Sequence, residues 1–196
     1  MIYLANSGGY NTFSIQKVIE RVGGKSEITS NPETLLKADK VLIPGVGHAK
    51  HAMDKINKLE IAEALTQRTR PTLGVCVGMQ LMFSHSEEGD VELLNIFPER
   101  VQHLPKSLRA PHMGWNSLAI QNSSSKLLKG IENGEFAYFV HSYYVENNKN
   151  TSAYCEYEDL KITAAIECDN FFATQFHPEK SASVGEKIMK NFLEMS

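Results

Sequence analysis

Long hydrophobic runs, abundant cysteine and an excess of positive charge are all missing from this sequence of 196 residues. No apolar stretch approaches the roughly 18 residues that a membrane-spanning helix requires. The N-terminus also lacks a charged stretch followed by a signal-like apolar segment. We therefore expect a soluble protein that has no membrane anchor and is not exported.

The cysteines and the charges argue against further classes of protein. Cys76, Cys155 and Cys168 are far apart and form no CxxC pair, so neither a disulfide framework nor a structural zinc site is expected. Since histidines and cysteines show no ligand spacing, we expect no metal, no cofactor and a reducing cytoplasm as the location. The 20 basic and 23 acidic residues give a formal net charge of -3, so nucleic acid is not an expected partner.

The glycine-rich opening segment 2–13, IYLANSGGYNTF, does not match a nucleotide-binding loop. It contains neither G-x-G-x-x-G nor G-x-x-x-x-G-K-[ST]. We expect instead a strand, a glycine turn and a helix whose start Asn11 can cap. The helix is indicated by an apolar stripe at helical spacing, formed by Ile15, Val18, Ile19 and Val22.

The order of segments predicts one α/β domain, residues 1–196, with enough apolar residues (42%) for a full core. Strands that alternate with helices predict a parallel sheet covered on both faces. The expected strands are 1–5, 40–45 and 71–77, with helices near 50–69 and 78–84. In the second half we expect antiparallel strands that extend this sheet, at 136–145, 151–157, 162–168 and 171–176, and a closing helix near 184–193.

Cys76 lies in TLGVCVGMQ, between Gly74 and Gly78. Most cysteines in apolar runs are small core residues, and the motif alone leaves that interpretation open. G-x-C-x-G also has the form of a nucleophile elbow, in which a strand turns sharply into a helix and presents the central residue. A helix N-terminus there would favour the reactive thiolate, and the N–H of Val77 could help to hold an oxyanion.

A cysteine nucleophile needs a base, and His177 is the best candidate among the seven histidines. In TQFHPEKS an apolar strand ends at Pro178, and Glu179 follows two positions after the histidine. In an extended chain both side chains point to the same side, so Glu179 can orient the imidazole. A solvated strand end explains the tripeptide alone, but together with G-x-C-x-G a nucleophile, base and orienting carboxylate is favoured.

The loop Pro44–Gly47 follows another apolar strand, in LIPGVGHA. An ordinary strand-ending turn would explain it. The glycines on both sides of Val46 would also let the peptide present an N–H toward an oxyanion, provided that the loop lies beside the elbow.

PGVG, GVCVGMQ and QFHPEKS resemble, in this order, the motifs of class I, triad-type glutamine amidotransferases. PHMGWN at 111–116, YFVHSYY at 138–144 and HSEEG at 85–89 look more narrowly like the glutaminase subunits of imidazole glycerol phosphate synthases, over essentially the whole chain. The resemblance implies a flavodoxin-like fold with a mixed, mostly parallel central sheet, helices on both faces and an antiparallel extension in the second half.

The same resemblance implies a reaction and a partner. The chain would hydrolyse L-glutamine to glutamate and ammonia through a cysteinyl thioester. The ammonia would pass through a channel into a (β/α)-barrel cyclase subunit of a heterodimer, which makes imidazole glycerol phosphate and AICAR in histidine biosynthesis. We also expect little glutaminase activity without the partner, because docking would complete the oxyanion loop.

The resemblance assigns roles to particular residues of this chain. Cys76 would be the nucleophile, His177 the acid and base, and Glu179 its orienter. Backbone groups would hold the oxyanion at Val46, Gly47 and Val77. The glutamine pocket would comprise Gly47, Gln80, Glu88, His141, Ser142 and Tyr143. The surface that faces the cyclase would comprise Asn11, Met113, Trp115, Asn116 and Lys180.

Some positions depart from the family pattern. The first strand of the family usually ends in an acidic residue, where this chain has Asn6, and Val77 stands where leucine is commoner. The segment Gly8–Asn11 replaces the usual G-x-G-N and is expected to be a docking rim. Two alternatives therefore stay open: a paralogous glutaminase that feeds another synthase, such as one building an amidino sugar, and a non-catalytic binding subunit.

Overall fold

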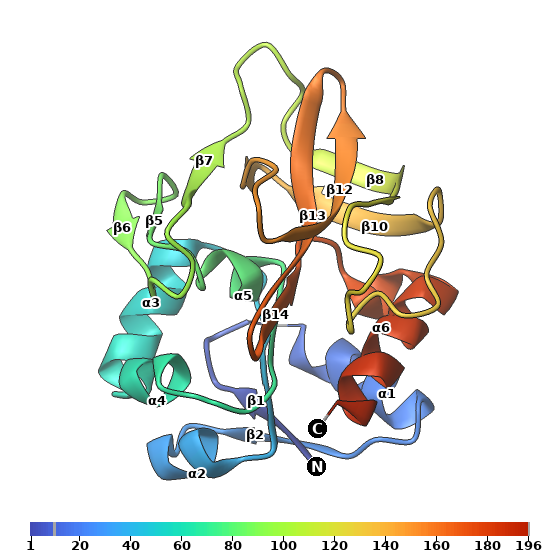
Figure 1. The fold of residues 1–196 in the computed structure, drawn as a ribbon. Coiled ribbons are helices and arrows are strands. Elements are labelled where there is room, and N and C mark those ends of the chain that lie inside the picture. Colours follow the sequence, from blue (N-terminus) through green and yellow to red (C-terminus); the bar gives the residue numbers. More distant parts are fainter. Residues whose placement is uncertain (10, 196) are drawn as a thin grey trace.

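A large mixed sheet with helices on both faces organises the chain (Figure 1). The computed structural model describes residues 1–9 and 11–195. The sheet has eight strands in the order β2–β1–β3–β4–β14–β13–β12–β9. Its strands are β1 Ile2–Ala5, β2 Ser26–Thr29, β3 Lys40–Ile43, β4 Thr72–Val75, β9 Ala119–Ile120, β12 Thr151–Tyr157, β13 Leu160–Cys168 and β14 Phe171–Thr174.

The helices and the smaller sheets complete the fold. The helices are α1 Thr12–Arg21, α2 Pro32–Lys37, α3 Ala49–Lys58, α4 Ala62–Thr66, α5 Val77–Gln80 and α6 Ala182–Glu194, with a 3-10 turn, η1, at Pro178–Lys180. The remaining strands are β5 His85–Ser86, β6 Val91–Glu92, β7 Arg100–His103, β8 His112–Ser117, β10 Phe136–His141 and β11 Tyr143–Tyr144. None of the helices in the described residues is long and apolar enough to span a membrane.

Five neighbouring strands of the sheet, β2, β1, β3, β4 and β14, run parallel to one another. The central strands β3 and β4 are almost wholly buried, as expected for strands covered on both faces. In Figure 1, α1 and α6 cover one face of the sheet, and α3 and α4 cover the other. The predicted parallel sheet between two helical layers is confirmed, and the carboxyl ends of its strands share one edge.

The antiparallel extension is confirmed for three of the four predicted segments. β13 pairs antiparallel with β14 and with β12, and the β12–β13 hairpin projects beyond the sheet (Figure 1). The prediction for 136–145 was wrong, because this segment leaves the large sheet. Its first part, β10, pairs with β8, and its last part, β11, pairs with β7, so the chain changes sheets at Ser142.

Other differences concern local backbone. PHMGWN was expected to contain a polar turn around Trp115, but it forms strand β8, in which His112 is buried and Met113 exposed. The helix predicted over 50–69 is divided into α3 and α4, since Glu60 adopts a left-handed φ of 54°. The helix predicted over 78–84 shortens to α5. Asn11 precedes α1, but its side chain makes no capping hydrogen bond.

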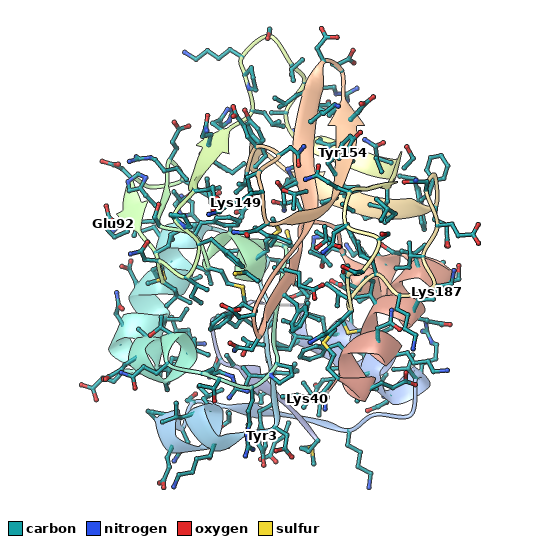
Figure 2. All side chains as sticks on the ribbon, viewed as in Figure 1. Tyr3, Lys40, Glu92, Lys149, Tyr154 and Lys187 are labelled. Carbon is teal, nitrogen blue, oxygen red and sulfur yellow. The ribbon has the colours of Figure 1, made fainter. Side chains whose placement is uncertain are left out.

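The apolar interior is one continuous cluster of buried side chains. The closing helix is confirmed as α6, which buries Val184, Ile188, Met189 and Phe192 and packs against α1. Figure 2 shows side chains filling the space between sheet and helices, with the charged Glu92 and Lys187 at the outer edges of the view. This packing fixes the positions of the strand ends that carry the candidate site.

Candidate functional site

The loops after β1, β3, β4 and β14 meet at the carboxyl edge of the parallel strands, where α/β sheets bind ligands. A cavity of about 300 Å³ opens there. It is lined by Val46, Gly47, Cys76, Val77, Gln80, Glu88, Pro111, Val140, His141, Ser142, Tyr143 and His177. A larger cavity of about 390 Å³ lies near Pro71 and Asn191, away from these loops, and its charged side chains are exposed. The chemistry of the lining therefore selects the smaller cavity.

Cys76 occupies a sharp turn between β4 and α5. Its φ of 53° and ψ of -110° are unusual for a residue with a side chain, and its N–H donates to the Thr174 carbonyl at 2.8 Å. A Cβ added to Gly78 would lie 1.9 Å from the Ile43 carbonyl oxygen. The backbone after the elbow thus lies directly against β3, which explains the glycine of the sequence motif and matches the geometry of a nucleophile elbow.

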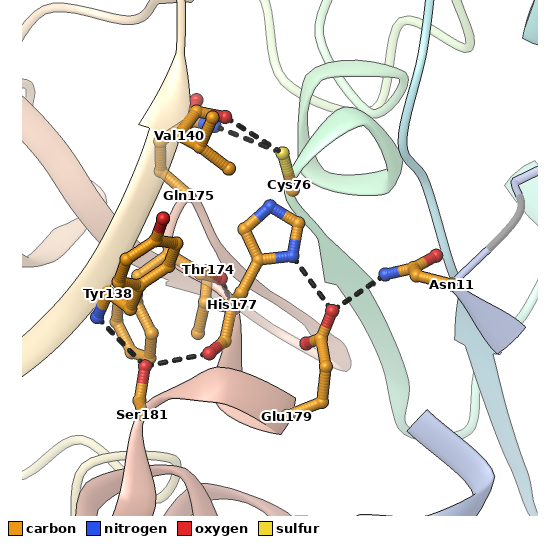
Figure 3. A network of polar contacts seen from close by, with 10 residues as sticks. Asn11, Cys76, Tyr138, Val140, Thr174, Gln175, His177, Glu179 and Ser181 are labelled. Atoms are coloured by element: carbon orange, nitrogen blue, oxygen red, sulfur yellow. Dashed lines mark hydrogen bonds and ion pairs between the residues drawn. The ribbon is translucent and has the colours of Figure 1, made fainter. Parts of the chain in front are cut away.

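His177 and Glu179 form a buried pair beside Cys76. The Nδ1 of His177 lies 2.8 Å from Oε1 of Glu179, and their side chains are 1% and 0% exposed. Figure 3 shows the imidazole between the Cys76 sulfur and the Glu179 carboxylate. The contact arises differently from the prediction, because Pro178–Lys180 forms a 3-10 turn and not an extended strand. The turn folds Glu179 back under the ring of His177.

The partners of His177 and Glu179 oppose the effect of burial on both groups. Burial lowers the pKa of His177, but hydrogen bonds and charge interactions with Cys76 and Glu179 outweigh it and raise the pKa to about 10. Burial raises the pKa of Glu179, but the contacts with His177 and Asn11 outweigh it and hold the pKa below its ordinary value. At neutral pH the site therefore holds an imidazolium on an ionised carboxylate.

Two further side chains contact this group of three, and one was not singled out from the sequence. Asn11 donates through Nδ2 to Oε1 of Glu179 at 2.8 Å, although it was expected to face the partner (Figure 3). Gln175 donates through Nε2 to the Cys76 sulfur at 3.8 Å. Its place two residues before His177 was the available signal, because alternate residues share a face at a strand end.

All three predicted oxyanion positions, Val46, Gly47 and Val77, line the cavity. In this structure the N–H of Val77 donates to the Gly45 carbonyl at 3.3 Å. An oxyanion would have to take the place of that carbonyl to receive the same N–H. The loop Pro44–Gly47 is thus beside the elbow, as required, with the Val77 donor engaged by the chain itself.

The predicted substrate residues gather around the same cavity. The Nε2 group of Gln80 donates to the Tyr143 carbonyl at 2.9 Å and to Oε1 of Gln175 at 3.1 Å. Glu88 is partly buried, and one carboxylate oxygen accepts the Ala49 N–H at 2.6 Å where α3 begins. These contacts hold an anionic and an amide side chain at the mouth and wall of the cavity.

The residues predicted to face a partner divide into two groups. Met113 and Trp115 are 63% and 53% exposed, and the Lys180 ammonium lies 5.6 Å from the centre of the Tyr138 ring. The amide of Asn116 instead turns inward and donates to the Glu156 carbonyl at 2.8 Å. Of the predicted docking rim Gly8–Asn11, Tyr10 lies outside the described residues, and Asn11 is directed at Glu179.

Comparison with known proteins gives the same family as the motifs. The model of the family "Glutamine amidotransferase class-I" matches residues 3–195. The imidazole glycerol phosphate synthase subunit HisH of Escherichia coli (strain K12) is 42% identical over 196 residues, covering 99% of each chain.

Two solved structures share the fold. A crystal structure titled glutamine amidotransferase has a TM-score of 0.76 and 14% identity, over 99% of this chain and 98% of that one. A putative GMP synthase protein from Thermoplasma acidophilum has a TM-score of 0.73 and 20% identity, over 98% and 91%. The sequence match over nearly the full length, with the elbow and its buried His–Glu pair, shows that this chain belongs to the class-I glutamine amidotransferase family.

Proposed function

We propose that this chain hydrolyses L-glutamine to glutamate and ammonia as the glutaminase subunit of an imidazole glycerol phosphate synthase. The observation that carries the proposal is the arrangement of Cys76, His177 and Glu179 at one wall of a cavity with room for a small amino acid. Membership of the family and the 42% identity to a synthase subunit support it.

The proposed reaction follows from the residue types and their order in space. The Cys76 thiolate attacks the side-chain carbonyl carbon of glutamine and forms a C–S bond. The protonated His177 then donates its proton to the amide nitrogen, the C–N bond breaks and ammonia leaves. Neutral His177 next takes a proton from water, the hydroxide attacks the glutamyl thioester, and the C–S bond breaks to release glutamate. Glu179 holds the imidazole in place and stabilises its charged form.

The cavity lining suggests how glutamine is held. The carboxylate of Glu88 suits the α-ammonium group of the substrate, and the amide of Gln80 lies beside it on the cavity wall. Val46, Gly47 and Val77 would supply backbone N–H groups to the oxyanion once the Gly45 carbonyl has moved away from Val77. We infer that docking of the partner brings about this movement.

The partner in this proposal is a cyclase subunit that receives the ammonia in the cytoplasm. An exposed group formed by Met113, Trp115 and the Lys180–Tyr138 contact supports a docking surface beside the site. The edge of the Trp115 ring meets Tyr138 at 6.0 Å between ring centres, so the two aromatic residues form a continuous patch. Exposed aromatic side chains of this kind are typical anchors at protein interfaces.

The experiment combines the chain with a histidine-pathway cyclase and measures cyclase product from glutamine and from an ammonium salt. Cys76→Ala is expected to abolish the glutamine-dependent activity and to keep the ammonium-dependent activity. Glutamine-dependent product in this variant would contradict the proposal. Glutamine hydrolysis without any association with the cyclase would indicate a glutaminase that serves another synthase.

A further inference from the structure

His112 and His141 form a buried hydrogen-bonded pair behind the wall of the cavity. They are cross-strand neighbours in the pairing of β8 with β10, and Nδ1 of His112 lies 3.0 Å from Nε2 of His141. The side chains are 4% and 6% exposed. His141 lines the cavity with Cys76 and His177, whereas His112 stands behind it.

The partners of both rings determine which nitrogen carries the proton. The Nδ1 of His141 lies 3.0 Å from the Tyr143 carbonyl oxygen, which can only accept, so Nδ1 must be the protonated nitrogen. Burial lowers the pKa of His141 to about 3, and the ring is neutral at physiological pH. Its Nε2 is therefore a bare acceptor, and Nδ1 of His112 must donate to it.

The same reasoning fixes His112. Burial lowers its pKa to about 4, so its Nε2 is also unprotonated and accepts from Nδ2 of Asn116 at 3.3 Å. The orientation of that amide is set independently, because Oδ1 of Asn116 accepts the Ser117 N–H at 2.8 Å while Nδ2 donates to the Glu156 carbonyl. Three hydrogen bonds thus run in one direction, from Asn116 through His112 and His141 to the Tyr143 carbonyl.

This chain of hydrogen bonds ends where the polypeptide changes sheets. β10 ends at His141 and β11 begins at Tyr143, so the bend between them forms part of the cavity wall. The Tyr143 carbonyl also accepts from Gln80, which in turn donates to Gln175, the residue whose amide contacts the Cys76 sulfur. A different tautomer of His141 would remove its donor from this carbonyl and loosen the bend.

We propose that His112 is a positioning residue for glutamine binding, which locks His141 in its Nδ1–H tautomer and thereby holds the wall at 141–143. The inference rests on the proposed function. His112 itself touches neither the cavity nor the reacting atoms. Aromatic stacking holds its ring in place, with Tyr157 at 4.3 Å and Phe139 at 5.0 Å between ring centres.

A pair of substitutions separates the hydrogen bond from the shape of the side chain. His112→Asn keeps a donor at the position of Nδ1, whereas His112→Gln places its amide toward Asn116 and leaves Nε2 of His141 without a donor. His112→Phe keeps the stacking and removes all the hydrogen bonds. Tyr157→Leu serves as the control, because it weakens the stacking on the same ring and leaves the three hydrogen bonds intact.

The measurements are the KM and kcat for glutamine in the complex with the cyclase, and the imidazole ¹⁵N shifts of the wild-type chain. His112→Gln and His112→Phe are expected to raise KM at least about tenfold with a smaller effect on kcat, since a buried group loses its partner. His112→Asn and Tyr157→Leu should stay within about threefold of wild type. The ¹⁵N spectrum should show His141 protonated at Nδ1 and not at Nε2.

Several outcomes would overturn the inference. Protonation of His141 at Nε2 would do so without any variant, as would an equal rise in KM for His112→Gln, His112→Asn and Tyr157→Leu. Wild-type activity with an unchanged KM in His112→Phe would overturn the inference alone. An inactive wild-type complex would overturn the proposed function and this inference with it.

Discussion

At the scale of single residues, Asn11 is the contact that links the N-terminal loop to the site. Its amide donates to the same carboxylate oxygen of Glu179 that contacts His177. We predict that Asn11→Ala lowers the kcat for glutamine hydrolysis about tenfold with little change in KM, because a hydrogen bond to a charged group contributes about 1.5–3 kcal/mol. Asn11→Asp should lower kcat further, since it places a second carboxylate beside Glu179.

Steady-state kinetics at saturating cyclase would check this prediction. Asn6→Ala is the matched control, because Asn6 lies in the same loop but donates to Ser30 at 3.0 Å, away from the site. Wild-type kcat in both Asn11 variants would show that the Glu179 carboxylate is held without this amide.

The raised pKa of His177 predicts a pH dependence of stability. A group that is more basic in the folded than in the unfolded chain stabilises the fold fully below its unfolded pKa, here near 6.5. That contribution is lost as the pH rises through the folded value of about 10. The difference in free energy of unfolding between wild type and His177→Asn should therefore shrink from pH 6 to pH 10, as measured by urea denaturation. A difference that grows with pH would contradict it.

At the scale of elements, close backbone contact between the elbow and β3 holds Cys76 in place. We predict that Gly78→Ala destabilises the chain by about 3 kcal/mol or more, because the added methyl group would overlap the Ile43 carbonyl. Gly130→Ala is the control: its φ of 74° disfavours a side chain, but no atom lies within 4 Å of the added carbon. Its cost should be about 1 kcal/mol. Equal denaturant midpoints for the two variants would contradict the account.

The elements that the sequence predicted well were those with a strong period. The parallel strands and α6 followed from buried runs and an apolar stripe, because a two-faced sheet and an amphipathic helix leave those patterns. PHMGWN was misassigned as a turn, since its Gly114 and Asn116 suggested a loop, yet pairing with β10 makes it a strand. The division of 136–145 at Ser142 has no local signal and depends on which strands are available as partners.

At the scale of the whole molecule, the motifs of the site could be predicted but several contacts could not. Cys76 and His177 lie 101 residues apart along the chain, yet the common edge of parallel strands brings them together. The 3-10 turn below His177 and the inward amides of Asn11 and Asn116 depend on side-chain packing between distant segments. Such contacts leave no spacing in the sequence.

The engaged N–H of Val77 predicts weak activity for the isolated chain. Since its bond to the Gly45 carbonyl competes with an oxyanion, and one such donor contributes about 10²–10³ in kcat, turnover should rise at least about a hundredfold when the cyclase binds. Glutamate release measured with and without the cyclase would check this. Full turnover by the isolated chain would contradict it.

The most direct test of the account is the site of labelling by a glutamine-analogue electrophile in the complex with the cyclase. Mass spectrometry of the digested chain should show one adduct, on the peptide that contains Cys76, with Cys155 and Cys168 unmodified and with protection by excess glutamine. The Cys155 thiol is buried, and burial raises its pKa to about 12, so it provides an internal control for non-specific reaction. An unlabelled Cys76, or labelling that glutamine does not prevent, would contradict a cysteinyl glutaminase.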